Sequence, residues 1–378
     1  MRFIAIGLFI ALLPLAAQSP PAPQKKEGQP ASQAKEPVKT APAEPEERRQ
    51  SNYVYDVNGR PAPGNPSAHE QRRGTGSGSV VDREEYLRDP QGRPVTVRRS
   101  QERVLSQKDD ERATERAIQR YDSSGRPTYK QLVRTERSKM PDGSTVSTEA
   151  WYEQDANGRM QFVERRTTTE KKTDAGGNAA TAVERPGING GLQVVERIDR
   201  TETKRSDAVT EVVSSRKLLD GNGRFSERDR ELSLVTKSGN TTTTETKQWQ
   251  LGPTGQMDFV SRSVSRLKES PEGSQTEDIE VYSTKIAGTT PDLNRPQVPT
   301  LEQQVHREKK VQPDGKTVET TTARLRQVAD PSRLGGLMVT EQVVTPTPEG
   351  KSIQTTVSER DANGKIVRVR SEVEEQKK

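Results

Sequence analysis

Two histidines, His69 and His306, limit the acid–base chemistry that this chain could perform near neutral pH. His69 stands in a polar segment beside a Gly-Ser run, and His306 stands among charged residues. A serine or cysteine nucleophile needs a histidine base within hydrogen-bond reach, and the sequence contains no cysteine. We interpret both histidines as solvated side chains. Paired carboxylates are abundant, but general acid catalysis needs one of them desolvated in a pocket. The sequence therefore predicts no catalytic residue and no enzyme.

The phrase Asp-x-Asn-Gly is the other arrangement that could do chemistry, because aspartate and asparagine oxygens can ligate calcium. It recurs at residues 56–59, 155–158, 220–223 and 361–364. Calcium loops place oxygen ligands at three alternating positions before the glycine and a glutamate well after it. Here the glycine follows the second oxygen-bearing residue directly, and an arginine or lysine comes next and would repel a cation. We therefore interpret the phrase as a turn and predict no metal-binding residue, no cofactor-binding residue and no cofactor.

Basic residues are numerous but evenly mixed with acidic ones. The chain has 61 Lys and Arg against 55 Asp and Glu, a net charge of +6 and a pI near 9.3. No block of Arg or Lys with interleaved aromatic residues is present, so the sequence predicts no nucleic-acid binding. Contact with anionic polymers of a cell envelope stays open.

The turn phrases also determine the elements that would position any site. Asn-Gly and Asp-Gly tolerate the positive φ that tight hairpin turns require. Glycines at 59, 92, 125 and 158 are spaced by 33 residues, and later turn glycines are spaced by 16 to 18. The unit is therefore one strand and one turn of about 17 residues. Strands of about 12 residues result, about 20 of them between Tyr53 and Glu374. Short turns between them make an antiparallel meander.

The strand faces are unusually polar. Between Phe162 and Thr173 neither alternate set of residues is apolar, whereas other strands are mildly one-sided. The one-sided sets are Leu192, Val194 and Ile198, then Met257, Phe259 and Leu267, and finally Val367, Val369 and Val373. With 28% hydrophobic residues and a mean hydropathy of −0.99, the chain lacks the apolar faces of a two-layer sandwich.

We therefore predict an all-β fold: a long antiparallel β-meander that forms an extended, largely single-layer twisted sheet with a thin apolar seam. Cross-strand pairs of Thr with Thr, and of Arg or Lys with Glu, would hold it together at about 0.2 to 1 kcal/mol each. A disordered polar chain is the alternative, and the regular turn spacing argues against it. A transmembrane β-barrel needs an apolar outward face about 25 Å tall, which segments such as Thr241–Gln248 cannot provide. We therefore predict no transmembrane barrel.

The N-terminus has the order of charge, short apolar core and small residues that is typical of a secretory signal peptide, with cleavage expected near Ala17. An uncleaved anchor is the alternative. The mature chain contains no segment of about 20 apolar residues that could span a membrane. The predicted organisation is 1–17 signal peptide, 18–50 disordered linker rich in Pro, Ala, Lys and Glu, 51–285 β-repeat meander, 286–300 Pro-containing insertion or hinge, 301–374 continued meander and 375–378 tail.

Two of the turn phrases carry a preceding tyrosine, at Tyr55-Asp56-Val57-Asn58-Gly59-Arg60 and Tyr121-Asp122-Ser123-Ser124-Gly125-Arg126. This Tyr-Asp-x-x-Gly-Arg unit resembles the YD repeats, of RHS type, of large bacterial surface and toxin-shell proteins. The resemblance is partial at 153–159 and 360–365, and most other units lack the tyrosine. It implies long antiparallel strands. In that family the strands form a spiralling shell around a cargo or are displayed at the cell surface.

These features together predict a non-enzymatic exported protein, periplasmic or extracellular, whose β-repeat sheet is a structural or binding surface. The partner class that fits is an envelope polymer or a protein that adds at a sheet edge, and open edges would also allow self-association. The alternative is an envelope assembly or transport factor that carries an amphipathic ligand along the apolar seam. In that case Phe162, Phe259, Trp249 and the valines would line one continuous groove.

Overall fold

The computed structural model describes residues 46–55, 60–63, 67–89, 93–284, 298–326, 334–361 and 363–377. Within these ranges the chain is all-β, as predicted, with 21 strands in one sheet. The strands are β1 (Glu46–Tyr55), β2 (Pro61–Pro63), β3 (Ser67–Arg73), β4 (Val80–Arg88), β5 (Pro94–Gln107), β6 (Glu111–Tyr121), β7 (Pro127–Lys139), β8 (Thr145–Gln154), β9 (Met160–Thr173), β10 (Gly176–Pro186), β11 (Leu192–Ser206), β12 (Val209–Leu219), β13 (Phe225–Ser238), β14 (Thr241–Leu251), β15 (Met257–Glu269), β16 (Gln275–Ser283), β17 (Thr300–Val311), β18 (Thr317–Arg326), β19 (Leu334–Thr347), β20 (Gly350–Arg360) and β21 (Ile366–Lys377).

The recurring turn phrase folds the same way at each described copy. At 155–159 the Asp155 amide donates to the Arg159 carbonyl at 2.8 Å, and Gly158 has φ +80°. The Asp155 carboxylate accepts the backbone N–H groups of Asn157 at 2.9 Å and Arg159 at 2.8 Å. Equivalent bonds are made by Asp122, Asp220 and Asp361. The interpretation of this phrase as a hairpin turn is confirmed.

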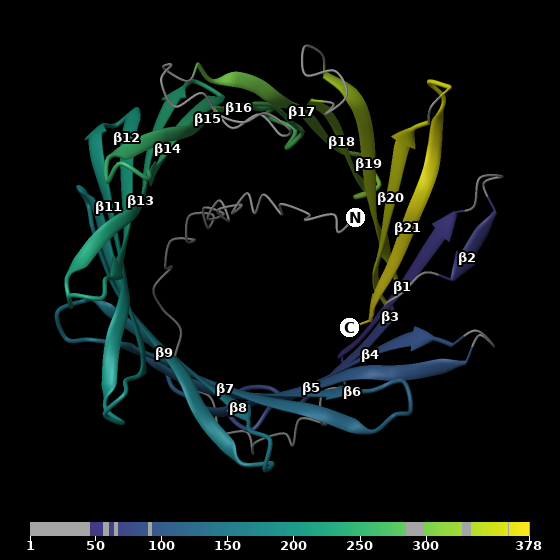
Figure 1. Cartoon of the computed structure of the whole chain (residues 1–378). Helices are drawn as coiled ribbons and strands as arrows, with labels where there is room; N and C mark the ends of the chain where they lie inside the picture. Colours follow the sequence, from purple (N-terminus) through teal and green to yellow (C-terminus); the bar gives the residue numbers. More distant parts are fainter. Residues whose placement is uncertain are drawn as a thin grey trace, which may run out of the picture. The chain divides into compact units, whose positions relative to one another are not determined.

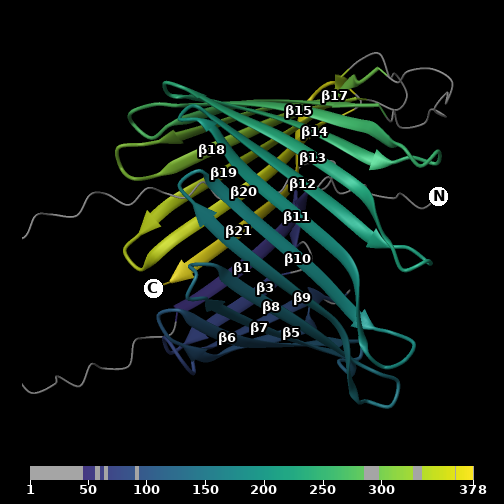
Figure 2. The same ribbon diagram turned by 90° about the vertical axis from the view of Figure 1, so that its left-hand side faces the viewer.

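The meander closes on itself, which the sequence did not predict. Each strand from β3 to β20 pairs with the next, and β21 pairs with β1 over eight positions from Glu47↔Lys377 to Val54↔Arg370. The other edge of β1 is taken by β3 and the three-residue β2. The result is a barrel of 20 strands, seen down its axis in Figure 1 and from the side in Figure 2. The prediction of an open sheet was therefore wrong, while the single layer and the antiparallel order were right.

A repeated β-bulge provides the curvature that closes the sheet. In nine successive hairpins, from β4–β5 to β20–β21, one extra residue is inserted near the start of the second strand. The inserted residues include Val97, Val163, Val195, Val260 and Val369. A bulge bends its strand and increases the local twist. Nine bends at the same end of the hairpins turn what would be an extended sheet into a ring.

The two faces of the wall can be assigned from register and burial. Cross-strand partners share a face, so the register divides the side chains of the ring into two sets. Nine of the ten buried hydrophobic residues on the described strands fall in one set, and only Val264 falls in the other. The nine are Ala68, Val104, Ile118, Val133, Val183, Ile279, Val281, Val305 and Ala323. Side chains inside a barrel converge on its axis and cover one another, so we assign this set to the inward face.

The bulges also explain why the predicted one-sided sets fail. Leu192 and Val194 point outward, but the bulge at Val195 reverses the alternation and Ile198 points inward. The sets ending in Leu267 and Val373 are split in the same way by the bulges at Val260 and Val369. A thin apolar seam does exist, on the inward face of β16–β19, where Ile279, Val281, Val305 and Ala323 cluster and Met338 packs against them.

The predicted organisation can be compared with the strands only in part. The signal peptide 1–17 and most of the linker 18–50 lie outside the described residues, and β1 begins at Glu46, within the predicted linker. Residues 285–297, most of the predicted insertion or hinge, also lie outside them. β16 and β17 pair at nine positions on either side of this segment, so the sheet is not divided there.

Candidate functional site

Both histidines point outward and each meets one carboxylate. The Nε2 atom of His69 lies 2.7 Å from Glu47 Oε1, and the Nδ1 atom of His306 lies 2.7 Å from Asp278 Oδ1. The His69 and His306 side chains remain 43% and 52% exposed. A histidine–carboxylate pair orients a catalytic base only when a nucleophile lies on its other side. Neither pair is buried, and both resemble the other cross-strand ion pairs of this wall.

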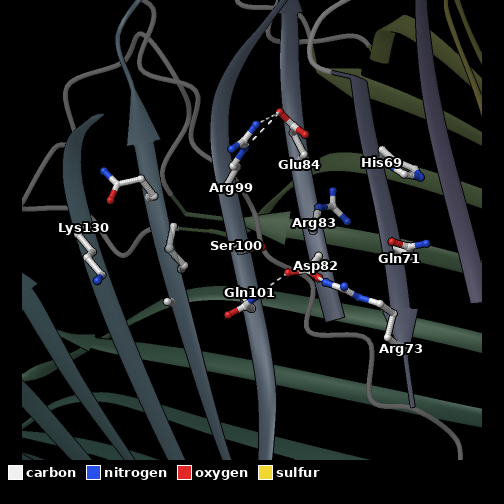
Figure 3. Close-up of a pocket in the computed structure, with 13 residues that line it drawn as sticks. His69, Gln71, Arg73, Asp82, Arg83, Glu84, Arg99, Ser100, Gln101 and Lys130 are labelled. Atoms are coloured by element: carbon white, nitrogen blue, oxygen red, sulfur yellow. Dashed lines mark hydrogen bonds and ion pairs between the residues drawn. The ribbon is translucent and has the colours of Figure 1, made fainter. Parts of the chain in front are cut away.

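A shallow depression of about 470 Å³ lies beside His69 on the wall formed by β3 to β7. Most of its lining side chains belong to the outward face (Figure 3). Within it the Glu84 carboxylate accepts bonds from Thr96 and from Arg99, whose Nη2 is 3.1 Å away. The Asp82 carboxylate accepts a bond from Gln101 at 2.8 Å and pairs with Arg73. The depression is lined by donors and acceptors that already satisfy one another.

The ionisation of these carboxylates does not suit acid catalysis. Hydrogen bonds from Thr96 and Arg99, against a smaller effect of burial, lower the pKa of Glu84 below its ordinary value. Burial raises the pKa of Asp82, but the bonds from Gln101 and Arg73 outweigh it and leave that pKa lowered. A general acid at neutral pH needs the opposite shift. Asp82 and Glu84 are therefore ionised at neutral pH and act in the depression as hydrogen-bond acceptors.

The outward face carries most of the aromatic residues, and they lie near one rim. Ten of the twelve aromatic side chains on the described strands point outward, most of them beside the Asp-x-x-Gly turns. Tyr152 packs edge-on against Phe162 at 5.6 Å between ring centroids, and Trp249 packs against Phe259 at 5.8 Å. The two residues of each pair are cross-strand partners, and they lie between the turn and the bulge of their hairpin. Each aromatic pair therefore packs the two strands together at the turn end of the hairpin.

A second depression of about 660 Å³ lies below this rim, lined by outward side chains that include Val213, Leu232, Trp249 and Met257. The predicted continuous groove is not formed. Phe162 lies on β9, four strands from β13, and the valines lie on both faces, Val183 inward and Val264 outward. The sequence analysis did not identify the two aromatic pairs, although an aromatic residue within three positions of a turn, as at Tyr152 and Trp249, could have indicated them.

The inward face of β5–β7 carries two pairs of arginines that face each other across neighbouring strands. Arg98 on β5 stands directly opposite Arg120 on β6, and Arg112 on β6 stands directly opposite Arg137 on β7. Arg116 occupies the inward face of β6 midway between Arg112 and Arg120. Like charges placed directly opposite each other destabilise a sheet. We call these five residues the arginine track. The sequence alone does not predict it, because the residues come together only through the register between neighbouring strands.

In the part of the chain that the structure describes, no three His, Asp or Glu side chains gather as they would around a metal ion. The described aspartates of the turn phrases instead accept bonds from backbone N–H groups, as shown above for Asp155. No helix within the described ranges could serve as a membrane-spanning segment.

Comparisons with known proteins identify no family. No family model matches the chain, and no curated protein matches it. Among solved structures, a bacterial polysaccharide outer membrane secretin matches 88% of this chain and 98% of its own, at 8% identity and a TM-score of 0.33. The beta domain of a Bordetella autotransporter matches 88% and 98%, at 9% identity and a TM-score of 0.15. A porin-like protein from Bacteroides uniformis matches 74% and 95%, at 10% identity and a TM-score of 0.14. Scores this low leave the function to be inferred from the residues of the chain itself.

Proposed function

We propose that the chain is a non-enzymatic, exported barrel of the cell envelope whose polar walls are a structural and binding surface. The observation that carries this proposal is the closure of one single-layer sheet that is polar on both faces. Cross-strand ion pairs run along the wall, for example Arg134–Glu115 at 2.8 Å and Arg262–Glu245 at 2.9 Å. Such a wall presents two large charged surfaces to water and uses little of its area for a core.

The same ion pairs favour an aqueous compartment, periplasmic or extracellular. Arg134, Glu115 and Arg262 lie on the outward face at some distance from either end of their strands. A lipid-facing wall would need apolar side chains over about 25 Å at this height. We therefore place the barrel outside the hydrocarbon of a membrane, after removal of the signal peptide near Ala17.

Closure changes how a partner could bind. Each of the 20 long strands is paired on both sides, so among the described strands only the three-residue β2 keeps an unpaired edge for strand addition or self-association. Binding then takes place on the faces of the wall, through many charged side chains. The alternative function is a carrier that holds an amphipathic ligand along an apolar seam. The only apolar surface that supports it among the described residues is the small inward cluster around Val305.

The test is a titration of the full mature chain with a fluorescein-labelled acidic polysaccharide, polygalacturonate, and with a neutral dextran of equal length. We expect anisotropy to report binding of the acidic polymer at low salt and clear weakening at high salt, because exposed charges are screened. Dextran should bind more weakly. Equal binding of both polymers, binding that does not depend on salt, or no binding by a barrel that remains folded would contradict the proposal.

A further inference from the structure

The arginine track on the inward face of β5–β7 is the feature of the wall that stability alone does not explain. Elsewhere cross-strand ion pairs join opposite charges, as in Arg165–Glu184 at 2.5 Å or Arg307–Glu277 at 2.9 Å. Like charges also face each other on the outward face, at Arg197↔Lys217 and Lys247↔Arg262. There carboxylates neutralise them, because Lys217 pairs with Asp199 at 2.9 Å and Glu245 pairs with both Lys247 and Arg262. The track instead sets Arg98 opposite Arg120 and Arg112 opposite Arg137. A cost of this kind, incurred on two adjoining strand pairs and on one face, indicates an anionic partner that is absent from the isolated chain.

The charges of the track are poorly neutralised by the protein. Within the described residues, Arg98 alone among the five has a carboxylate within 4.0 Å, namely Glu85 Oε1 at 3.6 Å. Its Nε atom is buried and has no hydrogen-bond partner. Arg112, Arg116, Arg120 and Arg137 are exposed toward the interior of the barrel. Glu102 is the cross-strand partner of Arg116, but the two side chains form no ion pair within 4.0 Å. The guanidinium groups of these four arginines are therefore available to other acceptors.

The track is long and nearly linear. Arg112, Arg116 and Arg120 follow one another on β6 at every fourth residue, which spaces them by about 13 Å along the strand. Arg98 stands beside one end of this row and Arg137 beside the other. The row runs from one rim of the barrel to the other. A single small anion would use one of these positions, whereas a polymer with repeated negative charges could use all of them.

The two inward aromatic residues of the described strands lie next to the track. Tyr129 on β7 is the cross-strand partner of Arg120, whose Cζ lies 5.5 Å from the ring centroid. Trp151 lies on β8, the strand after that, and its indole Nε1 is buried without a hydrogen-bond partner. An aromatic ring offers a flat apolar face with a polar edge, which suits the C–H face of a sugar ring. Guanidinium groups bind carboxylates through two parallel hydrogen bonds.

We propose that the arginine track, with Tyr129 and Trp151, binds an acidic polysaccharide inside the barrel, a polymer whose sugars bear carboxylates. Barrels of about 16 or more strands are wide enough to contain an aqueous channel, and this one has 20. The ends of the row at both rims would let the polymer lie along the wall from one opening to the other. This inference rests on the proposed function and adds to it the face, the residues and the class of polymer.

The test compares arginines on the two faces of adjacent strands, in the full mature chain. Arg116→Gln removes a track residue, and Arg103→Gln removes an exposed, outward arginine of β5 as the matched control. We expect the triple variant Arg112→Gln, Arg116→Gln and Arg120→Gln to weaken polygalacturonate binding roughly tenfold. The control should bind as the unaltered chain does. Because Arg120→Gln relieves a like-charge pair, its melting temperature should not fall.

The two tryptophans give a second readout of location. Trp249→Phe leaves only the inward Trp151, and Trp151→Phe leaves only the outward Trp249. Polygalacturonate should change the fluorescence emission of the first variant and not of the second.

If Arg103→Gln weakens binding as much as Arg116→Gln, or if Trp249 alone responds, the proposal for the arginine track is overturned while the proposed binding wall stands. A single-stranded oligonucleotide that binds more tightly than polygalacturonate, and depends on the track, would overturn the polysaccharide assignment. Failure of every polymer to bind would count against both proposals.

Discussion

Glu164 shows how single side chains stabilise a wall that has almost no core. Its side chain is 9% exposed on the inward face, and its carboxylate accepts bonds from Arg166 Nε at 2.6 Å and Arg185 Nη2 at 2.8 Å. Burial raises its pKa, but the bonds from the two arginines outweigh burial, and the pKa lies below the ordinary value. The folded barrel therefore stabilises the ionised form of Glu164.

Glu164→Gln should lower the free energy of unfolding at pH 7 by about 2 kcal/mol, because it removes the charge from two hydrogen bonds. A lowered folded pKa means that the stabilisation is complete above the unfolded value and is lost as the pH falls through the folded one. The deficit of the variant should therefore be largest at neutral pH and disappear in acid. Urea unfolding at several pH values measures this. Glu170→Gln, at an exposed inward position of the same strand, should behave like the unaltered chain, and an equal loss in it would contradict the prediction.

Glu302 is a contrasting case, since burial raises its pKa and the charge of Arg326 only partly opposes the effect. Glu302 is the extra residue of the bulge in β17. A raised folded pKa costs stability where the group is ionised and nothing below the unfolded value. Glu302→Gln should therefore raise the melting temperature at pH 7.5 and leave it unchanged at pH 3.5. If the melting temperature of Glu302→Gln were also higher at pH 3.5, the increase would be due to packing and not to the charge of Glu302.

At the scale of the strand and turn, one hairpin contains its own matched comparison. The turn after β12 reads Asp220-Gly221-Asn222-Gly223, and both glycines have open space where a Cβ would lie. Gly223 has φ +76°, whereas Gly221 does not have a positive φ of this kind. The two positions therefore differ in backbone conformation alone.

Gly223→Ala should destabilise the barrel by about 1 kcal/mol, because an L side chain is strained at that φ. Gly221→Ala should be neutral or stabilising by up to about 1 kcal/mol, since alanine restricts the unfolded chain. Thermal unfolding followed by circular dichroism compares the two variants directly. Equal losses at both positions would show that the turn tolerates no side chain at all.

The sequence was informative about hairpins and uninformative about bulges. Asp155, Asn157 and Gly158 specify a local turn through their own backbone bonds, so their spacing predicted turns, strand lengths and antiparallel order. A bulge at Val163 or Val195 has no comparable signature, because valine is also a common residue of regular strands. Missing the bulges reversed the assignment of faces beyond them, as at Ile198, and removed the curvature from the predicted sheet.

At the scale of the whole molecule, closure depends on contacts that no local pattern reveals. Glu47 pairs with Lys377 across 330 residues of sequence. The arginine track likewise arises from register between strands, so its residues looked like part of an evenly mixed surface. The low apolar content did predict a single layer, because that inference needs only composition. It could not distinguish an open layer from a closed one.

Closure makes the two ends of the described sheet neighbours, which a circular permutant can test. We expect a chain in which a short Gly-containing turn joins Lys377 to Glu46, with new ends in the turn at 174–175, to keep its strand content and to melt within a few degrees of the original. In an open sheet of 20 strands the same ends would lie about 90 Å apart. Circular dichroism and small-angle scattering would detect the collapse or aggregation that an open sheet predicts.

The antiparallel seam between β1 and β21 also constrains how such a chain can evolve. An antiparallel ring exists only with an even number of strands, because one added strand would make two neighbours parallel at the seam. Duplication or loss of one 17-residue unit therefore cannot leave a fully antiparallel closed wall, and would require a parallel pair of strands at the seam. Viable length changes come as whole hairpins, so we expect homologous genes to differ in steps of about 33 codons, the spacing from Gly125 to Gly158.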